Sequence, residues 1–71
     1  MMKGFVLCIR NEGYEASLEL RKLYPVIPDS EGARHHQIRV VDESGEDYLY
    51  PDTFFAPIKL SPKIKKVLLA A

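Results

Sequence analysis

The stretch Gln37–Pro51, QIRVVDESGEDYLYP, decides the fold that this sequence predicts. Ile38 and Val40 are spaced two apart before an acidic centre, and Tyr48 and Tyr50 have the same spacing after it. β-Branched and aromatic residues at period two are typical of a half-buried antiparallel pair of strands. The stretch therefore predicts a β-hairpin.

The acidic centre has the residues of a tight turn. Asp42 suits the first position of a type I turn, and Gly45 at the fourth position can take a positive φ and close a three-residue loop with a bulge. This turn sets the register Ile38–Tyr50 and Val40–Tyr48. A slip of one residue would pair Val41 with Tyr48 and turn the opposite face inward. The first register is the favoured one.

The composition is that of one small folded domain. The chain has 71 residues, of which 46% are hydrophobic and 28% charged. A chain near this size buries only about 60% of its unfolded surface, so its stability is marginal. Ten basic residues balance ten acidic ones, which argues against a generic nucleic-acid binder. One cysteine, Cys8, excludes an internal disulfide, and the chain has no Cys/His set for structural zinc.

The apolar runs in the sequence are short. No run approaches the ~20 residues needed to span a bilayer, and no signal peptide is visible. A small protein without disulfides is more typical of the cytosol than of secretion. We therefore expect a cytoplasmic protein that makes no membrane contact.

Two further strand regions precede the hairpin. Lys3–Arg10, KGFVLCIR, is apolar and too short for a core helix, so it predicts a buried central strand. Leu18–Ile27, LELRKLYPVI, predicts a second strand, although Glu15–Leu23 also has good helix propensity. Pro25 cannot continue such a helix, which favours the strand. Pro28–Gln37 is polar and predicts a loop that can include a short helical turn.

The segment after the hairpin predicts a turn, a strand and a helix. Asp52–Phe55 is expected to form a turn with aromatic residues beneath it, and Ala56–Leu60 a last short strand. Ser61 suits an N-cap and Pro62 the first position of a helix.

The predicted helix has an apolar stripe, formed by Ile64, Val67 and Leu68. About two helical turns are marginal alone, so the stripe must dock on something. We expect it to close one end of its own chain's fold, near Phe5 and Phe54. Docking on a second copy is the alternative.

This order of elements resembles a small SH3-like barrel. The residues that carry the resemblance are Lys22–Asp29, Ile38–Pro51, Phe54 or Phe55, and Ile58. More narrowly, Cys8–Leu18, CIRNEGYEASL, together with the hairpin resembles short, uncharacterised proteins of bacteria and their phages. The resemblance implies an all-β, five-stranded SH3-like barrel over residues 3–60, with a C-terminal helix over 61–71 in the same single domain. It implies no activity.

The chain departs from that pattern at two turns and in one aromatic residue. The pattern leads us to expect glycine at position 21 and near position 36, where this chain has Arg21 and His36. The Pro-rich ligands of SH3 domains lie in an aromatic groove that typically includes tryptophan. This chain has no tryptophan, so binding of such ligands is not expected.

The sequence does not predict an enzyme, a metal site or a cofactor. His35 and His36 are adjacent, and no Cys or third His is near enough in sequence to complete a metal site. Cys8 lies within a buried strand, where its thiolate is disfavoured. There is no Gly-rich phosphate loop and no serine nucleophile motif.

Aromatic and acidic residues carry the functional prediction. The chain has more tyrosine and phenylalanine than one small core needs, although most can pack in that core or at its ends. The acidic turn can simply be a solvated tip. The functional interpretation is a non-catalytic protein-interaction module, a small adaptor or regulator, with an unknown protein partner and a monomeric or weakly dimeric state. Its candidate binding residues are Tyr14, Tyr48, Tyr50, Phe54, Asp42, Glu43 and Asp47.

The alternative prediction is a small barrel that binds nucleic acid. It requires the basic residues of the first part of the chain to gather on one face, away from the acidic turn. Such a face would give binding that falls steeply with salt. Its candidate residues are Arg10, Arg21, Lys22, Arg34 and Arg39.

Overall fold

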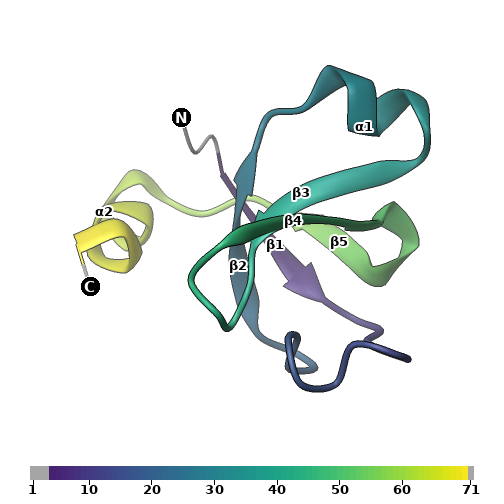
Figure 1. Ribbon diagram of the computed structural model, residues 1–71. Coiled ribbons are helices and arrows are strands. Elements are labelled where there is room, and N and C mark those ends of the chain that lie inside the picture. The colour runs from purple at the N-terminus through teal and green to yellow at the C-terminus, as the bar shows by residue number, and fades with distance from the viewer. Residues whose placement is uncertain (1–3, 71) are drawn as a thin grey trace.

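The computed structural model describes residues 4–70 and contains one antiparallel sheet of five strands in the order β4-β3-β2-β1-β5 (Figure 1). The strands are β1 (Gly4–Cys8), β2 (Leu23–Ile27), β3 (Gln37–Val41), β4 (Asp47–Pro51) and β5 (Phe55–Ile58). A short helix α1 (Ser30–Arg34), a 3₁₀ turn η1 (Asp52–Phe54) and a C-terminal helix α2 (Pro62–Ala70) complete the described chain. Within residues 4–70 the edge strands β4 and β5 do not pair, so the sheet is open. The expected five strands and C-terminal helix are present, whereas a closed barrel is not.

The organising hairpin has the predicted register. Ile38 lies opposite Tyr50 and Val40 opposite Tyr48. Gly45 has φ +85°, and its amide donates to the carbonyl of Asp42 over 3.0 Å. Val40 is 0% exposed and Tyr50 3% exposed, so a slip of one residue would move both out of the core.

The two strand regions before the hairpin agree with the prediction only in part. β1 is central as predicted, with β2 on one side and β5 on the other. The predicted strand Leu18–Ile27 is wrong in its first half, because only Leu23–Ile27 is extended. The helical alternative over Glu15–Leu23 is also wrong, since residues 15–22 form turns and irregular backbone and Leu23 begins β2. Arg21, at φ +61°, ends the turn that leads into β2.

The core lies on one face of the sheet. The loop residue Leu18 is 1% exposed and packs there with residues of every strand and of η1. Full burial of a large apolar side chain contributes roughly 1.5–3 kcal/mol. The core cluster consists of Val6, Cys8, Leu18, Tyr24, Val40, Tyr50, Phe54 and Phe55.

α1 is the short helical turn expected within Pro28–Gln37. Asp29 caps it by accepting from the Gly32 amide over 2.8 Å, and it also pairs with Arg39 over 2.8 Å. Both contacts hold the pKa of Asp29 below its usual range, and the hydrogen bond from the Gly32 amide has the larger effect. Gly32 lets α1 approach the hairpin closely, because a Cβ there would lie 2.7 Å from Leu49 Cδ2.

α2 does not dock on its own sheet. Its predicted N-cap is confirmed, since the Ile64 amide donates to Ser61 Oγ over 3.2 Å. None of its residues is buried, and Ile64 and Val67 are 51% and 63% exposed. Figure 1 shows α2 to one side of the sheet, at the end of a short segment that leaves the edge strand β5. The expectation that its stripe closes the end of its own chain's fold is therefore wrong. Neither helix of the described chain is long and apolar enough to cross a membrane.

Candidate protein-binding site

Asp42 holds the hairpin turn together from inside. Its side chain is buried, and its carboxylate accepts hydrogen bonds from the Ser44 amide over 2.9 Å, from the Ser44 hydroxyl and from the Tyr50 hydroxyl. Burial acts to raise the pKa of Asp42, but these hydrogen bonds outweigh it and lower the pKa below the usual value. Burial and the bond to Asp42 raise the pKa of Tyr50 to about 12. We call residues 42–48, the turn and the start of β4, the hairpin tip. Asp42 therefore anchors the structure of this tip.

A second polar cluster ties the tip to the first loop, residues 9–22. The Tyr24 hydroxyl donates to the Glu43 carboxylate over 2.6 Å and accepts from the Glu19 amide over 2.7 Å. Lys22 Nζ lies 2.6 Å from the same carboxylate, and the Glu43 amide donates to the Ser17 carbonyl over 3.0 Å. Lys22 and then Tyr24 lower the pKa of Glu43. The tip and the loop are thus fixed relative to each other.

Tyr14 and Tyr48 are the exposed tyrosines on this side of the sheet. Tyr14 is 43% exposed, and its ring meets the edges of Tyr50 and Phe54 at centroid distances of 5.0 Å and 5.9 Å. Tyr48 is 48% exposed, and its hydroxyl donates to Glu46 over 2.7 Å. Tyr50 and Phe54 are in the core, so they position Tyr14 and offer a partner almost no surface.

A hollow of about 360 Å³ lies between the first loop and β4. Two exposed tyrosine rings form its walls, and Asp42 and Ser44 contribute polar groups. Its size falls within the usual range of ligand sites, roughly 300–1,000 Å³. We call this hollow the tyrosine groove; it is lined by Tyr14, Ser17, Asp42, Ser44, Tyr48, Leu49 and Tyr50.

The groove brings together part of the predicted binding set. Tyr14, Tyr48, Tyr50 and Asp42 line it, whereas Phe54 lies in the core. Glu43 and Asp47 lie beside it and are already paired, with Lys22 over 2.6 Å and with Arg39 over 2.9 Å.

Three lining residues were not predicted. Ser44 could have been suspected from its place in the turn next to Asp42. Ser17 and Leu49 carry no signal in the sequence, because only the folding of the first loop against β4 brings them to one hollow.

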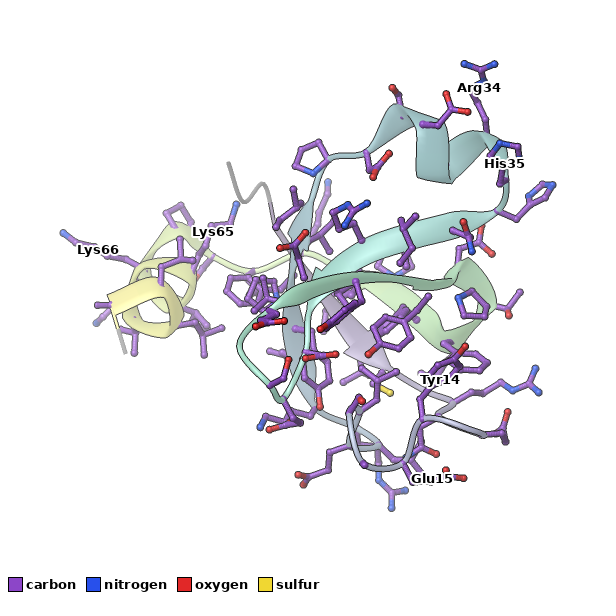
Figure 2. The ribbon with its side chains drawn as sticks, viewed as in Figure 1. Tyr14, Glu15, Arg34, His35, Lys65 and Lys66 are labelled. Atoms are coloured by element: carbon purple, nitrogen blue, oxygen red, sulfur yellow. The ribbon has the colours of Figure 1, made fainter. Side chains whose placement is uncertain are left out.

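The predicted basic residues do not form one free face. Four of them pair with nearby acids: Arg10 with Glu12, Lys22 with Glu43, Arg34 with Glu31, and Arg39 with Asp29 and Asp47. Arg21 lies beside the end of β1, where its amide donates to the Cys8 carbonyl over 2.7 Å. Figure 2 shows Arg34 at the opposite end of the molecule from Tyr14 and the first loop.

The potential nucleophile and metal ligands are dispersed. Cys8 is 0% exposed, and burial raises the pKa of its thiol. His35 and His36 are both exposed, at the end of α1. Within residues 4–70 no group of three His, Cys, Asp or Glu side chains is arranged to hold a metal ion.

No protein-family model, curated protein or solved structure matches this chain.

Proposed function

We propose that this protein is a non-catalytic protein-interaction module, a small adaptor or regulator. Its tyrosine groove would bind a peptide segment that carries Lys or Arg beside an apolar residue. The observation that carries the proposal is that Tyr14 and Tyr48, about half exposed, line one hollow next to the acidic tip. Tyrosine is enriched at the residues that dominate binding energy in protein interfaces.

The charge of the rim supports a basic ligand. Glu46 has no Lys or Arg partner within residues 4–70, and Asp42 lies in the wall of the hollow. A cation over a tyrosine ring gains roughly 0.5–2 kcal/mol, depending on how far it is desolvated. The aliphatic stem of the same Lys or Arg would cover apolar ring surface.

The polar clusters support a preformed site. Asp42 fixes the turn that carries Tyr48, and Glu43 joins the turn to the loop that carries Tyr14. A groove that is rigid before binding loses little conformational entropy when a ligand enters.

We also propose that the scaffold is an SH3-like barrel that is open at its edges. A long first loop, a tight β3–β4 hairpin and a 3₁₀ turn before β5 support this assignment. The proposed cellular location is the cytoplasm, where a chain without disulfides and with one buried thiol is common.

Selection of random peptides displayed on phage, with the full chain immobilised, tests the proposed function. We expect enriched peptides to contain Lys or Arg next to apolar residues. Tyr48→Ala should abolish their binding, and Tyr48→Phe, which keeps the ring, should retain most of it. Enrichment that is indifferent to Tyr48→Ala, or no enrichment, would contradict the proposal.

A further inference from the structure

The C-terminal segment carries positive charge without a partner. From residue 53 onward the sequence has no acid, and its four lysines are Lys59, Lys63, Lys65 and Lys66. None of the four forms an ion pair within residues 4–70. α2 has only nine residues and buries none of them. Helices this short are marginal in water without packing, so α2 needs a contact that residues 4–70 do not provide.

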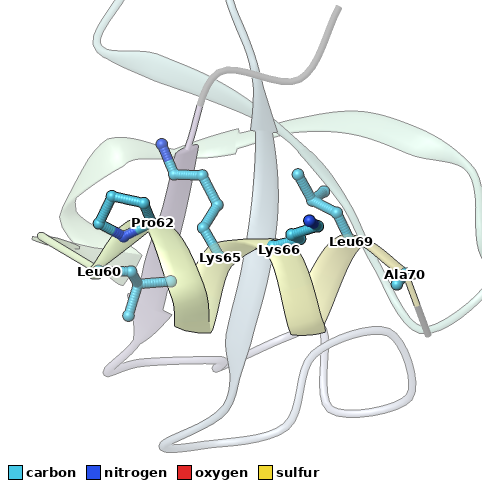
Figure 3. A pocket seen from close by; sticks show the side chains of 6 residues that line it. All are labelled: Leu60, Pro62, Lys65, Lys66, Leu69 and Ala70. Carbon is cyan, nitrogen blue, oxygen red and sulfur yellow. The ribbon is translucent and has the colours of Figure 1, made fainter.

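α2 borders a hollow with an apolar lining and a cationic rim. Its volume is about 540 Å³, and Leu60, Pro62 and Leu69 line it together with Ala70. Figure 3 shows Lys65 and Lys66 projecting from the helix on the same side as Leu69. We call this hollow the α2 hollow. An aromatic side chain flanked by carboxylates would match both its lining and its charge.

The hairpin tip of the same sequence has that chemistry. Tyr48 is 48% exposed and is bonded through its hydroxyl to Glu46. Glu46 has no basic partner within the described residues, and Asp47 is exposed beside it, where it also pairs with Arg39 over 2.9 Å. The chain is neutral overall, and four of its ten acids lie at the tip, whereas three of the four C-terminal lysines lie on α2. The tip of one copy and α2 of another are therefore complementary in charge.

We propose that the hairpin tip of one copy docks on α2 of a second copy. Tyr48 enters the α2 hollow, and Glu46 and Asp47 face Lys65 and Lys66. The inference rests on the proposed function, because it names the partner of the tyrosine groove and its tip. In a two-fold dimer each copy docks its tip on α2 of the other, so that both surfaces of both copies are in contact. We call this arrangement the exchange.

Two other occupants fit less well. Pairing α2 with α2 would bring lysines together with no acid between them. An anionic membrane would attract α2 but repel the acidic tip of the same neutral chain. Only a second copy uses both charged surfaces.

Sedimentation equilibrium of the full chain tests the exchange. The mass should rise with concentration from that of one chain to that of two, and high salt should weaken the association. Lys65→Glu/Lys66→Glu and, separately, Glu46→Lys should each weaken self-association roughly tenfold, since the side chain at position 46 then faces like charge on α2. An equimolar mixture of the two variants should recover the dimer, because in both of its contacts the side chain at position 46 again faces opposite charge. Lys63→Glu, on α2 but outside the hollow, is the matched control and should associate normally.

Three results would overturn the exchange. The first is that the full chain has the mass of one chain at every concentration. The second is that mixing the two variants does not restore the dimer, and the third is that the protein is a monomer that binds phosphatidylserine vesicles through α2. Peptide selection is a separate readout. A monomer whose selected peptides still require Tyr48 would remove the exchange but leave the proposed function intact. If the dimer recovers on mixing the variants but the selection enriches no peptide, the exchange would stand and the proposed peptide binding would be removed.

Discussion

Arg21 and His36 take backbone conformations that suit glycine. Their φ angles are +61° and +59°. Arg21 lies where the first loop turns into β2, and His36 follows the C-cap of α1, the position that is most often glycine. These are the two places where the resemblance leads us to expect glycine. At both positions the backbone therefore has a conformation that glycine favours, although the side chain is not that of glycine.

Replacing either residue with glycine should stabilise the protein. A side chain in the left-handed region costs roughly 1–2 kcal/mol, and the greater freedom of glycine in the unfolded chain offsets about 0.4–1 kcal/mol of that gain. Arg21→Gly and His36→Gly should each raise the free energy of unfolding in urea by several tenths of a kcal/mol or more. Arg21→Ala and His36→Ala, which keep a Cβ, are the controls. A glycine variant no more stable than its alanine control would show that these turns are unstrained.

Asp42 is the residue on which the shape of the tip depends most. Its pKa is lower in the folded protein than in the unfolded chain, because hydrogen bonds from Ser44 and Tyr50 outweigh the opposing effect of burial. Its contribution is therefore complete above the unfolded value of about 4, and it is lost as the pH falls through the lower folded value. Asp29 and Glu43, whose pKa values are also lowered, act in the same direction.

Asp42→Asn should therefore lower stability at neutral pH and flatten the acid limb of the stability curve. The loss should be roughly 1–3 kcal/mol, the usual cost of leaving buried partners imperfectly paired. Urea unfolding across a pH series measures both effects. Glu46→Gln, at an exposed position of the same turn, is the control and should unfold like the wild type. Equal curves for Asp42→Asn and the wild type would mean that Asp42 does not hold the turn.

At the scale of elements, the features that the sequence predicts correctly are those held by contacts between residues close in the sequence. The hairpin followed from alternation, from Gly45 and from the Asp42 turn, because these residues contact one another. The N-cap of α2 followed from Ser61 and Pro62 for the same reason. Leu18–Lys22 resembled a strand in its apolar spacing, but Leu18 enters the core from a loop while Leu20 stays 46% exposed. No pattern in the sequence shows that difference.

The candidate site was predictable only in part. The surplus of aromatic residues over the needs of a small core predicts that some of them are exposed, and Tyr14 and Tyr48 are. The same surplus points to Phe54, yet Phe54 is buried and its ring packs against that of Tyr14. Which surplus aromatic residues reach the surface depends on how the first loop folds over β4, and that is a tertiary property.

α2 should contribute nothing to the stability of one isolated chain. None of its side chains is buried, so Leu68→Asp should change the melting temperature of a dilute sample very little. Leu18→Ala is the contrasting variant, because Leu18 is 1% exposed and its loss should cost roughly 2–5 kcal/mol. Thermal unfolding at low concentration measures both. A large loss in dilute Leu68→Asp would mean that α2 packs on its own sheet after all.

At the scale of the whole molecule, the exposed tyrosines and the C-terminal lysines lie on different elements. Tyr14 lies on the first loop and Tyr48 on the hairpin. Figure 2 shows Lys65 and Lys66 on α2, to one side of the sheet, and Tyr14 on the first loop. A chain this small has little surface to spare. The tip, the groove and α2 are therefore the surfaces on which we propose that partners bind.

Amide chemical-shift mapping of the full chain, titrated with the strongest peptide from the selection, shows whether that peptide binds in the tyrosine groove. We predict that the shifts concentrate on residues 14–17 and 42–50, around the tyrosine groove and the tip, and that Tyr48→Ala removes them. Shifts centred instead on Arg10, Arg21 and Lys22, with the groove unchanged, would contradict it.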